Sequence, residues 1–108
     1  VPSWLGLKQT SQALTTDGSS SLAVDITSAI TEIDAGSGAG TVTLADGSNG
    51  QVKTIINVST SGTNVITITP TNLRGHTSVL LNAEGETVTL MFKNSNWNII
   101  AGHGYTTA

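Results

Sequence analysis

The side chains best suited to acid–base or nucleophilic chemistry are few and scattered in this 108-residue sequence. The two histidines are His76, in a polar loop beside Arg74, and His103, between two glycines near the C-terminal end. Nucleophilic catalysis needs a hydroxyl or thiol, a base within hydrogen-bond reach and a group that orients the base. Neither histidine lies in such a motif. We expect both to be surface or interface residues in a protein that is not an enzyme.

The acidic residues offer two further candidates for chemistry. Glu84 and Glu86 flank Gly85 and have the composition of an acid–base pair, but carboxylates at a turn are usually solvated and nothing in this spacing fixes their separation. Residues 46–50 resemble part of a calcium loop, yet the acidic ligands are too few and the closing glutamate at the twelfth position is missing. We predict no catalytic residue, no metal site and no cofactor.

Two other features have a possible binding role. The glycine-rich residues 36–40 open no helix and have no lysine after them, which argues against a phosphate-binding loop. Trp97 could offer an aromatic platform to a sugar or a base. We expect it instead in the core, paired across a hairpin with Val88 or Leu90, since an indole ring has a large apolar area to bury.

The charge and composition exclude several classes of partner. The net charge is −3, and the cations are Lys8, Lys53, Arg74 and Lys93, so no basic patch can neutralise a row of phosphates and no nucleic-acid partner is expected. No apolar run approaches the roughly 20 residues of a membrane helix, and no membrane partner is expected. Charged residues make up 10% of the chain, against about 25% in typical globular domains.

The elements that would carry any site are β-strands. Apolar residues alternate with Thr, Ser and Asn, which predicts about seven or eight short strands, over residues 22–27, 28–34, 41–44, 51–58, 65–69, 79–81, 87–92 and 97–101. Residues 46–50 predict a hairpin turn, and residues 94–96 another turn. The fold class is all-β, with an antiparallel sandwich, barrel or jelly-roll-like domain. A solenoid is less favoured because no fixed repeat stands out.

Residues 1–21 differ from the rest, and residues 22–108 form the β domain. The first segment begins with a small apolar cluster of Trp4, Leu5 and Leu7, followed by a run rich in Ser, Thr and Gln. One interpretation is a frayed end, since chain termini are commonly disordered. We favour a docking arm, because these three side chains are costly to leave in water.

Several strands carry apolar residues on both faces. In residues 51–58, for example, Val52 and Ile56 share one face while Ile55 lies on the other. A two-layer domain covers only one face of each sheet, so surplus apolar residues predict self-association, with a trimer as first choice and a dimer as second. The predicted oligomer interface consists of Ile55, Leu80, Met91 and Ile100.

Three stretches within residues 40–101 resemble virion proteins of tailed bacteriophages, in which similar patterns recur in head decoration proteins, head fibres and tail fibres. They are residues 44–55 (LADGSNGQVKTI), residues 85–92 (GETVTLMF) and residues 94–100 (NSNWNII). This resemblance implies a β module on a virus particle, usually trimeric, with no catalytic residues to carry over.

Within that group the sequence favours a capsid decoration, or cement, protein on the outer surface of the virion head. Its expected partners are its own copies and the major capsid protein, gripped by the arm of residues 1–21. An oligomer over a symmetry axis of the shell adds several modest contacts into a strong one. The alternative is a fibre or spike tip that binds host glycan through exposed Asn, Thr, Trp97 or Tyr105. A fibre-borne glycosidase is disfavoured by the shortage of acidic pairs.

Overall fold

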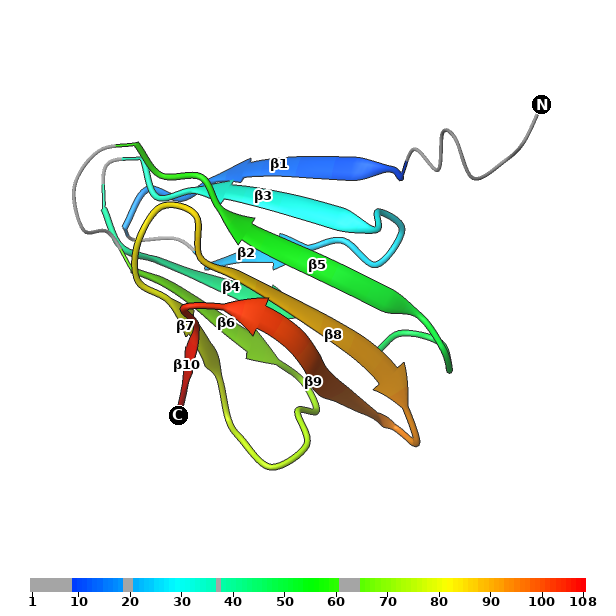
Figure 1. Ribbon diagram of the computed structural model, residues 1–108. Helices are drawn as coiled ribbons and strands as arrows, with labels where there is room; N and C mark the ends of the chain where they lie inside the picture. The colour runs from blue at the N-terminus through cyan, green and yellow to red at the C-terminus, as the bar shows by residue number, and fades with distance from the viewer. Residues whose placement is uncertain (1–8, 19–20, 37, 61–64) are drawn as a thin grey trace.

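The computed structural model describes residues 9–18, 21–36, 38–60 and 65–108, and in this part of the chain the regular structure is entirely β (Figure 1). Ten strands form two five-stranded sheets, so the predicted all-β class is confirmed. Sheet A has the order β1-β3-β5-β8-β9, and sheet B has the order β10-β7-β6-β4-β2. The strands are β1 (Ser11–Thr15), β2 (Ser21–Val24), β3 (Ile30–Asp34), β4 (Gly40–Leu44), β5 (Val52–Asn57), β6 (Ile66–Pro70), β7 (Val79–Leu81), β8 (Thr87–Lys93), β9 (Asn96–His103) and β10 (Thr106–Thr107).

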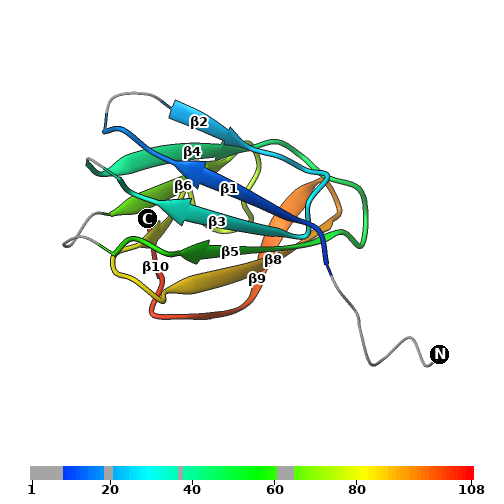
Figure 2. The same ribbon diagram turned by 90° about the horizontal axis from the view of Figure 1, so that it is seen from above.

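The first six strands wind as parallel coils. Successive strands alternate between the sheets, so β1, β3 and β5 run parallel in sheet A, and β2, β4 and β6 run parallel in sheet B (Figure 2). This is the winding of a two-sided β-solenoid. The prediction of antiparallel sheets is wrong for the pairs that these six strands make with one another. Ser11 lies beside Ile30, and Ile30 lies beside Thr54, so the coils differ in length and leave no fixed repeat in the sequence.

The last four strands are antiparallel. In sheet A, β8 pairs with β5 and then with β9, and in sheet B, β7 pairs with β6 and then with β10. The turn between β8 and β9 contains Asn94 and Ser95, both with positive φ (53° and 65°), which is the backbone of a tight hairpin turn. The predicted turn at residues 94–96 is confirmed.

The predicted hairpin at residues 46–50 is wrong. The chain does turn there, but β4 belongs to sheet B and β5 to sheet A, so the segment crosses from one sheet to the other. It packs on the core: a Cβ at Gly47 would lie 3.0 Å from the indole ring of Trp97. A larger residue would crowd the ring, so glycine favours this close approach.

The core lies between the two sheets and contains Trp97 as its largest fully buried side chain. Its ring meets Phe92 edge to face at 5.3 Å between centroids, and its Nε1 donates to the Ala45 carbonyl at 2.9 Å. The prediction that Trp97 is a core residue is confirmed, although its cross-strand partner is Phe92, and neither Val88 nor Leu90. The other buried apolar residues are Val24, Ile33, Ala35, Val42, Leu44, Ile55, Ile66, Ile68, Leu73, Val79, Leu81, Val88 and Leu90.

Part of the predicted docking arm belongs to the β domain. Residues Ser11–Thr15 form β1, which pairs with β3 along its whole length, and Leu14 packs against the core. The segment 1–21 is therefore not a free arm in its described portion. Trp4, Leu5 and Leu7 lie outside the described residues, and their docking role stays a prediction.

Candidate functional site

The outer face of sheet A presents a group of apolar side chains on β5, β8 and β9. We call it the β5–β9 face: Val52, Thr54, Ile56, Thr89, Met91, Ile100 and Ala101. On β5, the alternation puts Lys53, Ile55 and Asn57 inward and the residues between them outward. Val52 is 41% exposed and Ile100 is 50% exposed. None of these seven side chains is charged, and the carboxylate of Glu32 on β3 lies at the margin of the face, beside Ile56 in the pairing register.

The pairing register brings these residues together. Val52 lies opposite Met91, and Thr54 lies opposite Thr89, which in turn lies opposite Ala101. The hydroxyls of Thr54 and Thr89 bond to each other at 3.1 Å, so they satisfy part of their own hydrogen bonding. A bulge between Thr89 and Leu90 places Ile100 as an extra residue on β9 beside them.

The four predicted interface residues do not lie together. Met91, half-buried, and Ile100 share the β5–β9 face. Leu80, also half-buried, lies on the outer face of sheet B between Thr67 and Thr106. Ile55 is fully buried between the sheets, so its prediction as an interface residue is wrong. Residue pattern alone could not assign the faces of β5, because the inward positions include Lys53 and Asn57.

The outer face of sheet B is different in kind. Its central strands present Thr41 and Thr43 on β4 beside Thr67 and Thr69 on β6, in direct register. The rows continue with Ser21 and Ala23 on β2. Hydroxyl groups dominate this face, and water can satisfy them. The two sheets therefore offer one apolar and one hydroxyl-rich outer surface.

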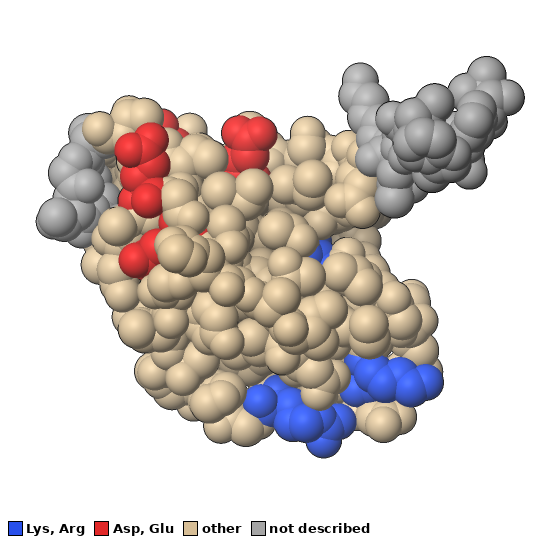
Figure 3. All heavy atoms as spheres, in the orientation of Figure 1, with Lys and Arg blue, Asp and Glu red and all other residues tan. Residues whose placement is uncertain are grey.

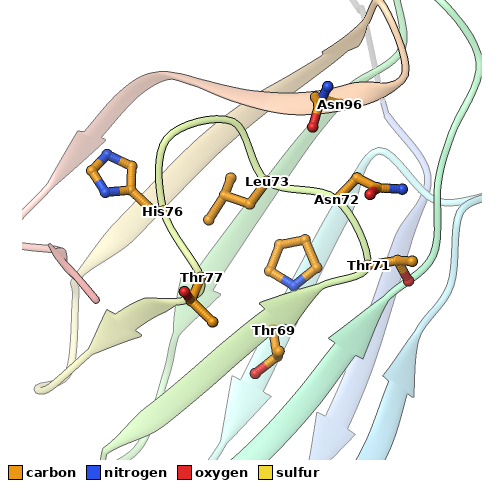
Figure 4. Close-up of a pocket in the computed structure, with 8 residues that line it drawn as sticks. Thr69, Thr71, Asn72, Leu73, His76, Thr77 and Asn96 are labelled. Carbon is orange, nitrogen blue, oxygen red and sulfur yellow. The ribbon is translucent and has the colours of Figure 1, made fainter.

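A polar pocket of about 400 Å³ opens beside the loop that follows β6 (Figure 4). Figure 4 shows side chains of this loop around the pocket, with Asn96 contributed by β9. In the described part of the chain, the hydroxyls of Thr69, Thr71 and Thr77 and the imidazole of His76 make no hydrogen bond. The full lining is Thr69, Pro70, Thr71, Asn72, Leu73, His76, Thr77 and Asn96.

The pocket loop is fixed by bonds to neighbouring segments. The Asn72 side-chain amide donates to both carboxylate oxygens of Asp46, at 3.0 and 2.9 Å. The backbone amide of Trp97 donates to the Asn72 carbonyl, and the amide of Arg74 donates to the Trp97 carbonyl. The position of the loop thus depends on β9 and on the β4–β5 connection, two segments far apart in sequence.

Neither aromatic residue predicted for sugar binding offers an open ring. Trp97 is fully buried, so the hypothesis of a Trp97 platform is wrong. Tyr105 is half-buried and packs against the core. The pocket was not predicted, because its residues come from a loop and a strand about twenty positions apart, and the sequence gives no signal that the two meet.

The charged residues are separated on the surface. In Figure 3, Lys and Arg gather at the lower edge, and Asp and Glu at the upper left. Arg74 and Lys93 are exposed. Lys53 is fully buried, and its Nζ donates to the Ser28 carbonyl at 2.7 Å and to Asp25 at 3.4 Å. It is unavailable to a partner.

Both members of the Lys53–Asp25 pair have lowered pKa values. Burial lowers the pKa of Lys53, against the opposing charge of Asp25. Partial burial acts to raise the pKa of Asp25, but the hydrogen bond from the Ser28 amide and the charge of Lys53 outweigh it, so this pKa lies below its usual value. Lys53 and Asp25 together hold the β2–β3 connection onto β5, which is a structural role.

The residues considered for catalysis are dispersed. The Glu86 carboxylate accepts a 2.6 Å hydrogen bond from the backbone amide of Asn82 and so stabilises the turn before β8. Glu84 is exposed. His76 lines the pocket and His103 is exposed on β9. Among the described residues, no three His, Cys, Asp or Glu side chains are grouped so that they could hold a metal ion.

Comparison with known proteins adds no assignment. No protein-family model matches the chain, and no curated protein matches it. The described residues also contain no helix long and apolar enough to cross a membrane.

Proposed function

We propose that this chain is a structural protein of a tailed-bacteriophage particle, a decoration or cement protein that self-associates and binds the outer surface of the capsid. The observation that carries the proposal is the β5–β9 face, whose seven side chains are uncharged and on which Val52 and Ile100 are exposed. Burying such a face contributes about 25 cal/mol for each Å² of apolar surface removed from water. The sequence resemblance to phage virion proteins supplies the kind of particle.

Self-association and particle binding have separate parts in this proposal. The β5–β9 face holds copies together, in a trimer by preference, and the segment containing Trp4, Leu5 and Leu7 contacts the major capsid protein. Several copies about a symmetry axis then bind through several equivalent contacts, so modest individual affinities combine. The shortage of charge fits contacts made by shape and backbone pairing.

Sedimentation of purified protein tests the first part. We expect an oligomer at micromolar concentration, which Met91→Lys combined with Ile100→Lys dissociates, because like charges would be buried face to face. Thr41→Lys combined with Thr43→Lys is the matched control, since it adds two charges to the outer face of sheet B and should leave the oligomer unchanged. A folded wild-type monomer at all concentrations would contradict the proposal.

Electron microscopy of particles that lack the protein tests the second part. After mixing, we expect added density on the capsid at symmetry axes of the shell. Deleting residues 1–8 removes none of the ten strands of the described fold and should abolish this density without changing the oligomer. Density on the tail would overturn the assignment to the capsid. Equal binding by the truncated protein would overturn the docking role of residues 1–8.

The polar pocket favours a second candidate, a fibre or spike tip that binds host glycan. Four polar side chains that make no hydrogen bond within the described residues line the pocket together with the largely buried Pro70 and Leu73, and sugars present hydroxyls together with apolar C–H faces. Binding to purified host surface polysaccharide that His76→Ala and Thr77→Ala weaken, without any binding to capsids, would select this candidate over the first.

A further inference from the structure

The two sheets end on the same side of the molecule in strands that have only one hydrogen-bonded neighbour each. β1 pairs only with β3, and β2 pairs only with β4, within the described residues. The two strands contact each other, and each is the last strand of its sheet. One side of the coiled half therefore presents two adjacent free strand edges.

These edges lack the features that usually prevent pairing with another chain. Proteins protect edge strands with charged residues, proline, bulges or very short strands. β1 has the sequence SQALT and β2 has SLAV, with no charge, no proline and no bulge. The opposite side is protected: β9 contains a bulge, and β10 has only two residues. The molecule is thus asymmetric in its capacity to add strands.

The backbone groups on the free edge of β1 can be assigned. The Thr10 carbonyl accepts from Ile30, and the Thr16 amide donates to Asp34, so the even-numbered residues face β3. In a parallel ladder, the residues between them direct their N–H and C=O groups to the other side. The backbone groups of Ser11, Ala13 and Thr15 are therefore open to a new strand.

We propose that this double edge binds a second copy of the chain, β1 against β1 and β2 against β2, about a two-fold axis perpendicular to the sheets. A partner that continues both edges at once must present two strands at the spacing of packed sheets, about 10 Å. A second copy has this spacing because its own β1 and β2 belong to the same two packed sheets. The axis makes both pairs antiparallel, and the absence of charge in either strand avoids like-charge repulsion.

The contact also extends the core. Leu14 on β1 and Leu22 on β2 pack against the core but are only half-buried, because no further coil covers them. In a solenoid, the end coil must be capped or stacked to bury such residues. The two-fold contact would place Leu14 and Leu22 against the same residues of the partner.

This inference deepens the proposed self-association, on which it rests, by giving the oligomer an interface separate from the β5–β9 face. Ala13→Pro is the sharpest variant, because proline removes an amide that the folded chain does not use and edge strands tolerate it. Ala13→Val is the matched control, since it keeps the amide and suits a strand. Circular dichroism and thermal unfolding establish that each variant folds.

Sedimentation velocity and hydrogen exchange test the contact in the full chain. We expect Ala13→Pro to halve the mass of the assembly and Ala13→Val to keep it. In the wild type, exchange of the Ser11, Ala13 and Thr15 amides should slow as concentration rises, and Met91→Lys with Ile100→Lys should not remove this slowing.

The failing outcomes separate the two proposals. An oligomer that Ala13→Pro leaves intact, but that Met91→Lys with Ile100→Lys dissociates, overturns the edge contact alone. Protection of the Ala13 amide that does not depend on concentration also overturns it, because the edge is then covered within one chain. A wild type that is monomeric at every concentration overturns both.

Discussion

The coiled half of the molecule, β1 to β6, and the hairpin half, β7 to β10, reach the same two sheets by different routes. In the coiled half, the chain passes to the opposite sheet after each strand and forms one strand there before it comes back. Strands that are neighbours in a sheet are therefore separated by a whole coil in sequence. In the hairpin half, β8 and β9 are joined by a two-residue turn. Both halves contribute inward apolar residues to one continuous core.

The comparison teaches that periodicity and strand direction are independent. Thr-Val-Thr on β4 and Thr-Val-Thr at the start of β8 have the same alternation, yet β4 has parallel neighbours and β8 antiparallel ones. The difference comes from the connections. A hairpin returns the chain beside itself, whereas a crossing segment carries it to the other sheet and forces parallel pairing on its return.

The largest expected effect is at Trp97, which joins the two halves. Trp97→Ala removes the largest buried side chain, its contact with Phe92 and its bond to Ala45 in the β4–β5 connection. We expect the free energy of unfolding to fall by about 3–5 kcal/mol in urea denaturation. Trp97→Phe keeps a ring but leaves the Ala45 carbonyl unpaired, and should cost less. A loss below about 1 kcal/mol for Trp97→Ala would break the picture of a shared core.

The next effect is at the ion pair that holds the β2–β3 connection of the coiled half. Asp25→Ala removes the acceptor for the Ser28 amide and hydroxyl and leaves the Lys53 ammonium without its countercharge. We expect a loss of about 1–3 kcal/mol, measured by urea denaturation at pH 7. Lys53→Met, which removes the buried charge itself, should cost less. A larger loss of stability for Lys53→Met than for Asp25→Ala would show that the Lys53–Asp25 pair does not hold the β2–β3 connection in place.

The same pair predicts a pH dependence. The pKa of Asp25 lies below its usual value of 3.8, so its contribution to stability is present above that pH and is lost as pH falls through the lower folded-state pKa. Acid titration of the unfolding free energy should therefore be less steep in Asp25→Asn. At the alkaline end, the lowered pKa of Lys53 makes stability rise as pH approaches 10.5 from below. An equal acid slope in wild type and Asp25→Asn would contradict the first assignment.

The smallest effect distinguishes the two kinds of connection. Ser95 has a positive φ in the β8–β9 turn, where glycine is favoured, so Ser95→Gly should stabilise the protein by about 1 kcal/mol. Ser48, in the crossing between the sheets, has no positive φ, and Ser48→Gly should be neutral or slightly destabilising because it adds freedom to the unfolded chain. Thermal unfolding measures the stability change of both variants. A stabilising effect of both substitutions would contradict the distinction between the hairpin turn and the crossing segment.

Most strands could be predicted from the sequence, but their partners could not. The residues of β4, β6, β7 and β8 follow the predicted ranges closely, because alternation and Pro70 mark them. The residue types of the segment at residues 46–50 predict a turn, but they do not indicate which sheet the chain enters next. Residues 102–108 showed no periodicity, yet β10 forms there because β7 offers a free edge.

The candidate surfaces were predicted only in part. Met91 and Ile100 do lie on one outer face. Each follows an apolar residue, Leu90 or Ile99, whose side chain points into the core. Ile55 was misplaced because its inward neighbours, Lys53 and Asn57, are polar, and their burial depends on distant partners: Asp25 for Lys53, and the Leu81 carbonyl for Asn57. Alternation of residues within one strand does not predict such distant hydrogen-bond partners.

The sequence by itself determined that this chain forms short β-strands with little charge, because backbone preference and alternation are local properties. Only the tertiary structure decided that the first six strands coil in parallel, which face of β5 is buried and where two free edges meet. The physical reason is that pairing direction and burial depend on contacts between residues a whole coil apart. Those contacts leave one apolar face and one bare double edge, the surfaces on which the proposed assembly depends.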